Sequence, residues 1–325
     1  MKNAIATALL LALATGAGAN DGIGAVAAGG IVFGKTDAVA MKKEVLNVGH
    51  DRITVDYEFL NESGADVVET IVFPMPAYPV QQQEADTYYG QPSGFTVTVD
   101  GKPVRMRTVV RALYADKDVT AQLVKAGLSD AQIAYGTVFD DRVRVPRLSA
   151  AQRRRLNDAG LFGDGPEWDA QVSYVWQQKF PSNRIVRVHH AYRPLVSAGP
   201  GESSVDPDTV KRYCVDDAFL KGWDKVIERA NSHPQGGYDA AKVAYILKTG
   251  NTWKNGIEDF TLNVVKSAPS ELVTLCFPGT FKKIDAKTYQ VRLRNFRPTR
   301  DLDVFFGIPG RGGSIYGPDM PRLSR

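Results

Sequence analysis

Residues 52–59 read RITVDYEF, and this stretch decides the fold class. Apolar and polar side chains alternate along it, and a period of two is typical of a β-strand with one buried and one exposed face. The same alternation returns in Val172–Phe180, Val186–Tyr192 and Tyr289–Asn295. The pattern therefore predicts a mainly β protein.

Turn residues separate these alternating segments. Asp100-Gly101 lies between two of them, which is a strong signal for a β-hairpin. Pro74 and Pro76 end the apolar strand Val67–Phe73, because proline cannot donate to a strand ladder. A parallel sheet would need a crossover helix after most strands, and such helices are missing from the pattern. We therefore expect antiparallel β-sandwiches.

The order of signals along the chain predicts two β-sandwich units with a small helical insertion. The first unit spans residues 20–198 and carries the insertion at about 116–163, where Ser129-x-x-Gln132 and Ser149-x-x-Gln152 are capping boxes. The second, β-rich unit spans residues 199–325, with one helix at about 216–230. The segment 194–207 is rich in Pro, Gly and Ser and is the best candidate for a linker.

Residues 1–19 have the layout of a secretory signal peptide. A short positive start precedes the apolar run Ala4–Ala14, and the segment ends Ala17-Gly18-Ala19. The run is far shorter than the roughly 20 residues of a membrane-spanning helix. No later segment is apolar for long enough to span a bilayer, so we expect no transmembrane segment in the mature chain. The sequence predicts a periplasmic or secreted protein, cut before Asn20.

The chain has only two cysteines, Cys214 and Cys276. Two cysteines in an exported chain most often form one disulfide, and we predict that bond here. A thiol nucleophile or a metal site is the functional alternative.

Arginines are concentrated in the helical insertion, where Arg153, Arg154 and Arg155 follow a capping box. They form either a solvated helix face or a contact for phosphate or carboxylate groups of the envelope, because arginine binds such groups bidentately. The formal net charge of the whole chain is only +4. Export makes nucleic acid an improbable partner, and none is predicted.

Motifs that would carry catalysis are missing. The sequence contains no recognisable nucleophile elbow, phosphate loop or zinc-binding histidine pair, so we assign no catalytic residue, no metal and no cofactor. His189 and His190 are neighbours on a strand and point to opposite faces. Trp168 and Trp253 fall in expected loops, where they are candidates for stacking against a ligand such as a sugar.

Several segments together resemble the bacterial family numbered 4424 among domains of unknown function. They are Asn20-Asp21, Gly29–Phe33, Phe73–Pro76, Phe180-Pro181, His189–Pro194, Tyr245–Thr249 with Trp253, and Phe296–Leu302. The resemblance spans nearly all of the mature chain. It implies a secreted or periplasmic protein and supplies no catalytic residues.

Residues 50–115 also resemble, more faintly, the vault/inter-alpha-trypsin inhibitor (VIT) domain. The shared features are a strand, a turn containing Asn61, a strand ending Phe-Pro-Met-Pro, and a Val-Asp-Gly hairpin. That domain is a β-sandwich of extracellular interaction proteins. The adhesion domain with a metal site that usually accompanies it has no counterpart here, so the interaction role is implied by analogy only.

Three hypotheses for function follow. The first is a non-enzymatic periplasmic protein that binds an envelope protein or a glycan. The second is an envelope hydrolase acting on glycan or peptide, which a pocket with two converging carboxylates of raised pKa would favour. The third is a structural assembly factor that adds a partner's strand, which an uncovered and uncharged sheet edge would favour.

Overall fold

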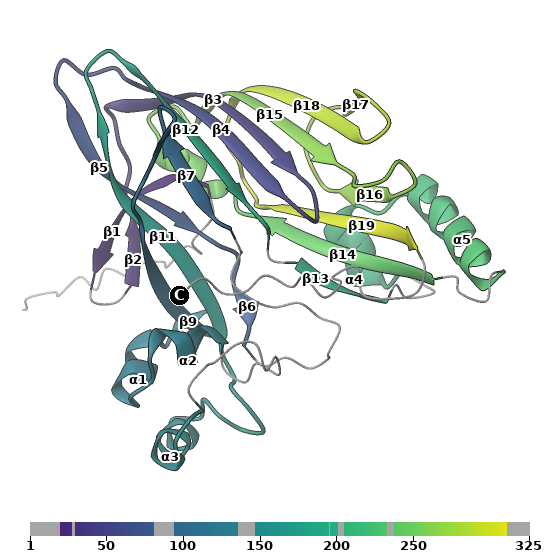
Figure 1. The fold of residues 1–325 in the computed structure, drawn as a ribbon, viewed down its shortest axis with the longest axis horizontal. Helices are drawn as coiled ribbons and strands as arrows, with labels where there is room; N and C mark the ends of the chain where they lie inside the picture. Colours follow the sequence, from purple (N-terminus) through teal and green to yellow (C-terminus); the bar gives the residue numbers. More distant parts are fainter. Residues whose placement is uncertain are drawn as a thin grey trace, which may run out of the picture.

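The computed structural model of the chain describes residues 20–27, 30–80, 94–135, 147–194, 196–200, 205–232 and 237–310. The described chain is mainly β, as predicted, and its strands form three sheets (Figure 1). The predicted signal peptide, residues 1–19, lies outside the described residues.

The largest sheet has eight strands and crosses the top of the molecule in Figure 1. Its order is β17 (Lys282–Lys283), β18 (Thr288–Phe296), β15 (Ile257–Val265), β3 (Val39–Val48), β4 (Ile53–Asn61), β12 (Ile185–Tyr192), β7 (Thr96–Val99) and β8 (Lys102–Pro103). Its neighbouring strands are antiparallel except β3 and β15, which run parallel.

Two smaller sheets face it. The seven-stranded sheet has the order β10 (Lys117–Asp118), β9 (Arg107–Tyr114), β11 (Asp169–Phe180), β5 (Val67–Pro74), β1 (Gly22–Ala27) and β2 (Gly30–Phe33), and β6 (Tyr78–Pro79) also pairs with β11. The four-stranded sheet has the order β13 (Val196–Pro200), β14 (Gly237–Tyr245), β19 (Leu302–Gly310) and β16 (Leu272–Leu275).

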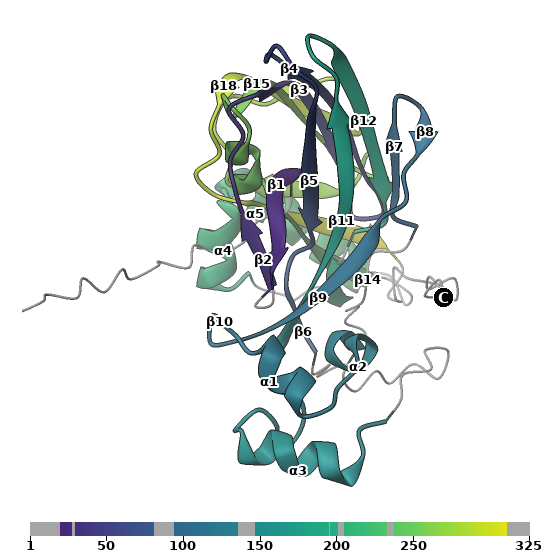
Figure 2. The same ribbon diagram turned by 90° about the vertical axis from the view of Figure 1, so that its left-hand side faces the viewer.

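The main hydrophobic core lies between these sheets. Along β4 the burial alternates as predicted, with Val55, Tyr57 and Phe59 inside and Asp56 on the exposed face. Apolar side chains from all three sheets meet in one cluster, in which Phe59, Phe73 and Phe306 are fully buried. Figure 2 shows the eight-stranded sheet and the seven-stranded sheet as two layers.

The two predicted β units share one sheet. β15 belongs to the second unit and pairs in parallel with β3 of the first over most of their length. The predicted boundary near residue 199 therefore divides the chain, but it does not divide the eight-stranded sheet or the main core. The physical reason is that an unpaired strand edge in either half exposes backbone donors and acceptors, which pairing across the boundary satisfies.

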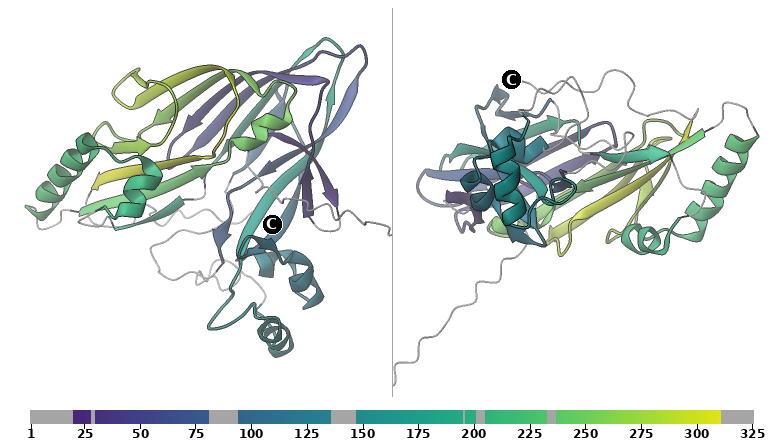
Figure 3. Two further views of the ribbon diagram at one scale, coloured as in Figure 1. Left: turned by 180° about the vertical axis from the view of Figure 1, so that it is seen from behind. Right: turned by 90° about the horizontal axis from the view of Figure 1, so that it is seen from below.

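The helices lie in two groups, and Figure 3 shows them at different ends of the molecule. The first group falls inside the predicted insertion and comprises α1 (Thr120–Lys125), α2 (Asp130–Tyr135) and α3 (Ala150–Asp158). Its capping boxes are confirmed, since Ser149 and Gln152 each bond the other's backbone N–H, and Ser129 and Gln132 do the same. A second core joins these helices to β9 and β11.

The second group covers the four-stranded sheet. It comprises α4 (Pro207–Tyr213) and α5 (Asp217–Asn231), while the short 3-10 helix η1 (Lys248–Thr252) follows β14. α5 fits the predicted helix, and Asp216 caps it by accepting from the Phe219 backbone N–H at 2.7 Å. Phe219 and Trp223 pack against Phe305 of β19 in a third core.

Strands form in a glycine-rich segment and in the expected linker. The glycine-rich segment 22–34 is the hairpin of β1 and β2, and the expected linker 194–207 contains β13 and the first residue of α4. The Asp100-Gly101 hairpin is confirmed, with φ of 47° and 78° at its two loop residues. Among the described residues, no helix is both long enough and apolar enough to cross a membrane.

The predicted disulfide between Cys214 and Cys276 is present, with the two Cα atoms 5.0 Å apart and a sequence separation of 62. Closing a loop of this length contributes about 4 kcal/mol in the chain-entropy description.

We expect the reduced protein to unfold at lower urea concentration, with a free energy of unfolding lower by up to about 4 kcal/mol. The chain has no other cysteine for a reductant to affect. Two thiols that react with a thiol reagent in the folded, unreduced protein would contradict the assignment.

Candidate functional site

A cluster of polar side chains lies inside the main core. Asn20 and Asp21, the first two described residues, are 0% and 1% exposed, which is unusual for polar residues. We call the group the N-terminal cluster, and it consists of Asn20, Asp21, Glu44, Tyr57, His190, Tyr245 and Thr249. Strands β3, β4, β12 and β14 contribute one side chain each, and η1 contributes Thr249.

Asn20 is the centre of the hydrogen-bond network. Its backbone N–H donates to Thr249 Oγ1 at 2.7 Å, and that hydroxyl donates back to the Asn20 carbonyl at 2.7 Å. The Asn20 amide donates from Nδ2 to Glu44 Oε2 at 2.9 Å, and its Oδ1 accepts from the Tyr57 hydroxyl at 2.7 Å. Because the Tyr57 proton is used in this way, the Tyr245 hydroxyl is the donor in the 3.1 Å contact between the two tyrosines.

The two carboxyl groups of the cluster are held away from water. Burial raises the pKa of Glu44 to about 8, although the Asn20 hydrogen bond opposes the shift. Burial, with a further contribution from Glu44, raises the pKa of Asp21 well above its usual value. Burial lowers the pKa of His190 to about 3, so the imidazole 3.4 Å from Asp21 Oδ2 is neutral at neutral pH.

The hydrolase hypothesis requires two converging carboxylates of raised pKa, and burial raises the pKa of both Asp21 and Glu44. Both side chains are sealed in the core, at 1% and 0% exposure, so a substrate cannot reach them in this structure. The cluster is therefore built to hold Asn20 and Asp21 in place. Trp253 reinforces it by donating from Nε1 to the Asp21 carbonyl at 2.6 Å.

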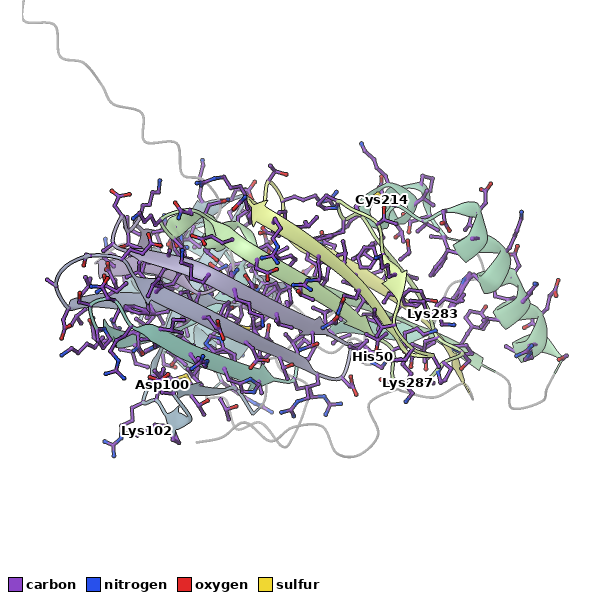
Figure 4. All side chains as sticks on the ribbon, turned by 90° about the horizontal axis from the view of Figure 1, so that it is seen from above. His50, Asp100, Lys102, Cys214, Lys283 and Lys287 are labelled. Carbon is purple, nitrogen blue, oxygen red and sulfur yellow. A yellow bond between two sulfur atoms is a disulfide. The ribbon has the colours of Figure 1, made fainter. Side chains whose placement is uncertain are left out.

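A second group of polar side chains superficially resembles a catalytic triad. His50 lies at one end of the eight-stranded sheet (Figure 4), with Ser267 Oγ and Glu271 Oε1 at 3.2 and 3.3 Å. Both contacts are made by the same ring nitrogen, Nε2, whereas a triad needs one nitrogen for the hydroxyl and the other for the acid. Glu271 also accepts from the backbone N–H groups of Ser267 and Ala268, so this group fixes a loop.

The outer face of the eight-stranded sheet is polar and largely paired within itself. Gln290, Asn263, Asn47 and Thr54 form a chain of side-chain hydrogen bonds of 2.9, 2.7 and 2.9 Å across four strands. Beside it is a hollow of about 380 Å³. Four of its polar side chains contact one another in pairs, with His189 Nδ1 2.7 Å from Asp56 Oδ1 and Arg187 Nε 3.3 Å from Glu58 Oε1.

The seven-stranded sheet carries a groove of about 550 Å³, which we call the arginine groove. β1 forms one wall, the segment around the start of β9 forms the other, and β5 and β11 form the floor. It is lined by Ala25, Val26, Thr70, Arg105, Met106, Arg107, Val175, Trp176 and Gln177. Figure 2 shows the strands that frame it.

The arginine groove combines free positive charge with an apolar surface. Arg105 and Arg107 are exposed, and no side-chain hydrogen bond or ion pair joins either of them to another described residue. Ala25 and Val26, both exposed, supply apolar surface on the β1 wall. On the floor, Gln177 Nε2 donates to Thr70 Oγ1 at 2.7 Å, which leaves the Gln177 carbonyl oxygen as an acceptor and the Thr70 hydroxyl as a donor for a ligand.

The groove also exposes a strand edge. β1 pairs with β5 at only two positions, Gly22 with Val72 and Ile23 with Ile71, and then leaves it. The segment Val67–Thr70 pairs with β11 on its other side, and no described strand pairs with it on this side. Its backbone can therefore accept an added strand.

The arginines predicted to contact anions lie elsewhere, on α3. Arg153 and Arg154 are exposed, whereas Arg155 donates from Nη1 to the Ala126 carbonyl at 3.2 Å and helps hold α3 to α1. Their role in binding an anion stays a prediction.

The prediction that Trp168 and Trp253 stack against a ligand is wrong for this structure. They are 2% and 0% exposed. Trp168 lies in the second core and donates to the Ile133 carbonyl at 2.9 Å, and Trp253 packs on Phe59 with ring centroids 4.2 Å apart. Loop position did not imply exposure, because each indole finds both an apolar contact and a buried carbonyl to accept its N–H. His189 and His190 do point to opposite faces, as predicted.

The sequence analysis did not identify the arginine groove or the N-terminal cluster. Arg105 and Arg107 flank Met106 directly after a predicted hairpin, and their i, i+2 spacing on an extended segment was the available signal. Nothing local marks Asn20 and Asp21 as buried, because their partners lie up to 229 residues away.

Comparisons with known proteins give one family and several distant structures. The family described as "Domain of unknown function (DUF4424)" matches residues 19–305. A "putative nutrient binding protein" of Legionella pneumophila is similar at 19% identity and a TM-score of 0.43, over 89% of this chain and 70% of that one. An M1 zinc metallopeptidase from Deinococcus radiodurans is similar at 10% identity and a TM-score of 0.28, over 84% of this chain and 43% of that one. No curated protein matches the chain.

Removing the Tyr57 hydroxyl tests the N-terminal cluster. Tyr57→Phe leaves Asn20 Oδ1 and the Tyr245 hydroxyl without their partner, and an unsatisfied buried polar group costs about 1–3 kcal/mol. Tyr245→Phe removes only a donor to the Tyr57 oxygen and should cost about 1 kcal/mol. Urea unfolding of the two variants measures the difference. If Tyr57→Phe is as stable as the unchanged protein, the network does not hold Asn20 as described.

Proposed function

This chain belongs to the DUF4424 family, and we propose that it acts by binding, taking an acidic segment of an envelope protein in the arginine groove. The observation that carries the proposal is the pair of unpaired arginines, Arg105 and Arg107, beside an apolar surface. Guanidinium groups bind carboxylates with strong, charge-assisted hydrogen bonds, and neither arginine has such a partner among the described residues.

A peptide fits the groove better than a glycan does. Alongside the arginines, the free edge of Val67–Thr70 offers backbone donors and acceptors in the repeat of a β-strand. Thr70 and Val68 point to one face of β5, and Glu69 points to the opposite face, so its charge is directed away from the arginines. A glycan site would be expected to offer aromatic rings, and the groove is lined by a single aromatic residue, Trp176, which is buried.

The third sequence-based hypothesis, strand addition, is thereby part of the same proposal. The segment Val67–Thr70 provides the edge, and the edge strand β2 is uncharged along Gly30–Phe33, with Val32 61% exposed. We propose that the partner's acidic segment adds as a strand to β5 and places its carboxylates against Arg105 and Arg107.

The envelope setting is also a proposal. It is supported by the layout of residues 1–19 and by the disulfide between Cys214 and Cys276, which persists in an oxidising compartment. We propose a periplasmic or secreted protein that begins at Asn20 after cleavage.

Fluorescence anisotropy with defined probes tests the binding proposal. The probes are a labelled octapeptide of alternating valine and aspartate, the same peptide with lysine in place of aspartate, and an oligogalacturonate as an anionic glycan. We expect the acidic peptide to bind, and its affinity to fall as salt rises. The double variant Arg105→Gln/Arg107→Gln should weaken binding about tenfold or more, since a factor of ten corresponds to about 1.4 kcal/mol.

The matched control is Arg153→Gln/Arg154→Gln. It removes the same charge from an exposed helix face and should leave the affinity for the acidic peptide unchanged. Equal affinity for the groove variant and the unchanged protein would contradict the site. Tight binding of the oligogalacturonate without binding of the peptide would contradict the ligand class.

A further inference from the structure

The N-terminal cluster contains two acidic groups and no cation. Glu44 Oε1 and Asp21 Oδ1 have no hydrogen-bond partner among the described residues, although both atoms are buried. The basic group nearest to them, His190, has a pKa of about 3 and is neutral. The other ionisable groups that face Glu44 and Asp21 are Tyr57 and Tyr245, which are neutral because burial raises the pKa of each.

If the chain is cut before Asn20, the Asn20 backbone nitrogen changes from a peptide amide to an α-amino group. The Asn20 backbone nitrogen is buried and donates its single hydrogen to Thr249 Oγ1 at 2.7 Å. Four bonds separate this nitrogen from Asn20 Nδ2, which lies 2.9 Å from Glu44 Oε2. Standard bond lengths then place the nitrogen within roughly 8 Å of the Glu44 carboxyl group.

We propose that cleavage before Asn20 leaves the new α-ammonium group inside the N-terminal cluster, where it pairs with the Glu44 carboxylate. The inference rests on the proposed export of the chain. Water adds across the Ala19–Asn20 peptide bond in a reaction catalysed by an envelope signal peptidase. The water oxygen bonds to the Ala19 carbonyl carbon, which becomes a carboxylate, and the Asn20 nitrogen takes up both water protons. It becomes an ammonium group with two more N–H donors than the amide had.

Cleavage before Asn20 would therefore supply the positive charge that the N-terminal cluster lacks. In a chain that still carries residues before Asn20, the Asn20 nitrogen is an uncharged amide, and Glu44 must stay protonated or lie buried as an unpaired charge. In the processed chain one carboxylate gains a buried counter-ion, and Asp21 can keep its proton. The ammonium group brings two further donors into a cluster in which Glu44 Oε1 and Asp21 Oδ1 are buried acceptors without a partner among the described residues.

The two forms should differ in how stability depends on pH. Without the ammonium group, the pKa of Glu44 is about 8 in the folded chain, compared with an ordinary 4.5. A raised carboxyl pKa means that the folded state binds more protons than the unfolded state between these values. Stability is then complete below the lower value and is lost as pH rises through the upper one. The ammonium group lowers the pKa of Glu44 and removes this loss.

Two chains that differ only at the start make the comparison. One begins at Asn20 and the other at Gly16, with four more native residues, and each is released from a fusion partner by a protease that cuts directly before its first residue. Urea unfolding is measured from pH 5 to pH 8. Asp21 has a raised pKa in both chains and contributes to the pH dependence of both. We expect the longer chain to lose more stability than the shorter one as pH rises, with the difference reaching up to about tenfold in the folding equilibrium constant per pH unit.

Glu44→Gln in both chains tests whether the difference arises from the pairing of Glu44 with the Asn20 α-ammonium group. The substitution should remove the pH-dependent difference between the two chains, because it removes the titrating partner. If the variant does not fold, the reactivity of the α-amine decides instead. At pH 7 the Asn20 amine of the folded chain should resist reductive methylation, whereas the Gly16 amine should react as an exposed amine does.

Three results would overturn the inference. They are equal stability and equal pH dependence of the two chains, rapid methylation of the Asn20 amine in the folded protein, and a mature protein from the envelope that begins at another residue. Peptide binding by the arginine groove is measured separately, so its failure would leave this result intact.

Discussion

The hydrogen bonds of Asn20 are the constraint on which the rest of this structure depends. They join the start of the described chain to β3 through Glu44, to β4 through Tyr57 and to η1 through Thr249. The first two elements belong to the eight-stranded sheet, whereas η1 follows a strand of the four-stranded sheet. Each bond contributes about 0.5–1.5 kcal/mol net, but a buried donor or acceptor left without a partner costs about 1–3 kcal/mol. The network therefore penalises any arrangement in which Asn20 leaves the core.

This anchoring fixes the strand that follows. β1 must leave the cluster at Asp21 and pass close to η1 and β5, and its glycines permit that approach. A Cβ at Gly22 would lie 3.0 Å from Thr249 Cβ, and one at Gly24 would lie 2.9 Å from Val72 Cγ2. The glycine-rich segment thus serves close packing. Because β1 then diverges from β5, it becomes the wall of the arginine groove and exposes the edge of β5. The proposed binding site is therefore a consequence of how Asn20 is held.

The sequence predicted local features well because each depends on neighbouring residues. The alternation in residues 52–59 identified which side chains of β4 face the core, and the Ser-x-x-Gln capping boxes identified two helix starts. The sequence did not predict which distant strands pair with one another. Period two states that a strand has a buried face, but it does not state that β3 pairs with β15, more than 200 residues away. For the same reason, the sequence did not predict that one sheet joins the two sandwich units.

The candidate sites show the same limit. The pairing of Cys214 with Cys276 followed from their number, whereas Trp168 and Trp253 were misplaced because loop position does not report burial. Arg105 and Arg107 matter only through their juxtaposition with Val26 of β1 and Gln177 of β11, which no short motif encodes. Asn20 and Asp21 are polar residues in a position where polarity usually indicates exposure, and their burial follows only from the partners that the fold supplies.

Amide hydrogen exchange at Ile23 tests the central claim most directly. Ile23 is the first core residue after the cluster, and its N–H donates to Thr252 Oγ1 at 3.0 Å. If the buried residues Asn20 and Asp21 are part of the cooperative fold, the Ile23 amide should exchange as slowly as that of Tyr57 in β4, because both require global unfolding. Exchange at Ile23 that is about a thousandfold faster than at Tyr57 would show that β1 opens locally, and would contradict the account.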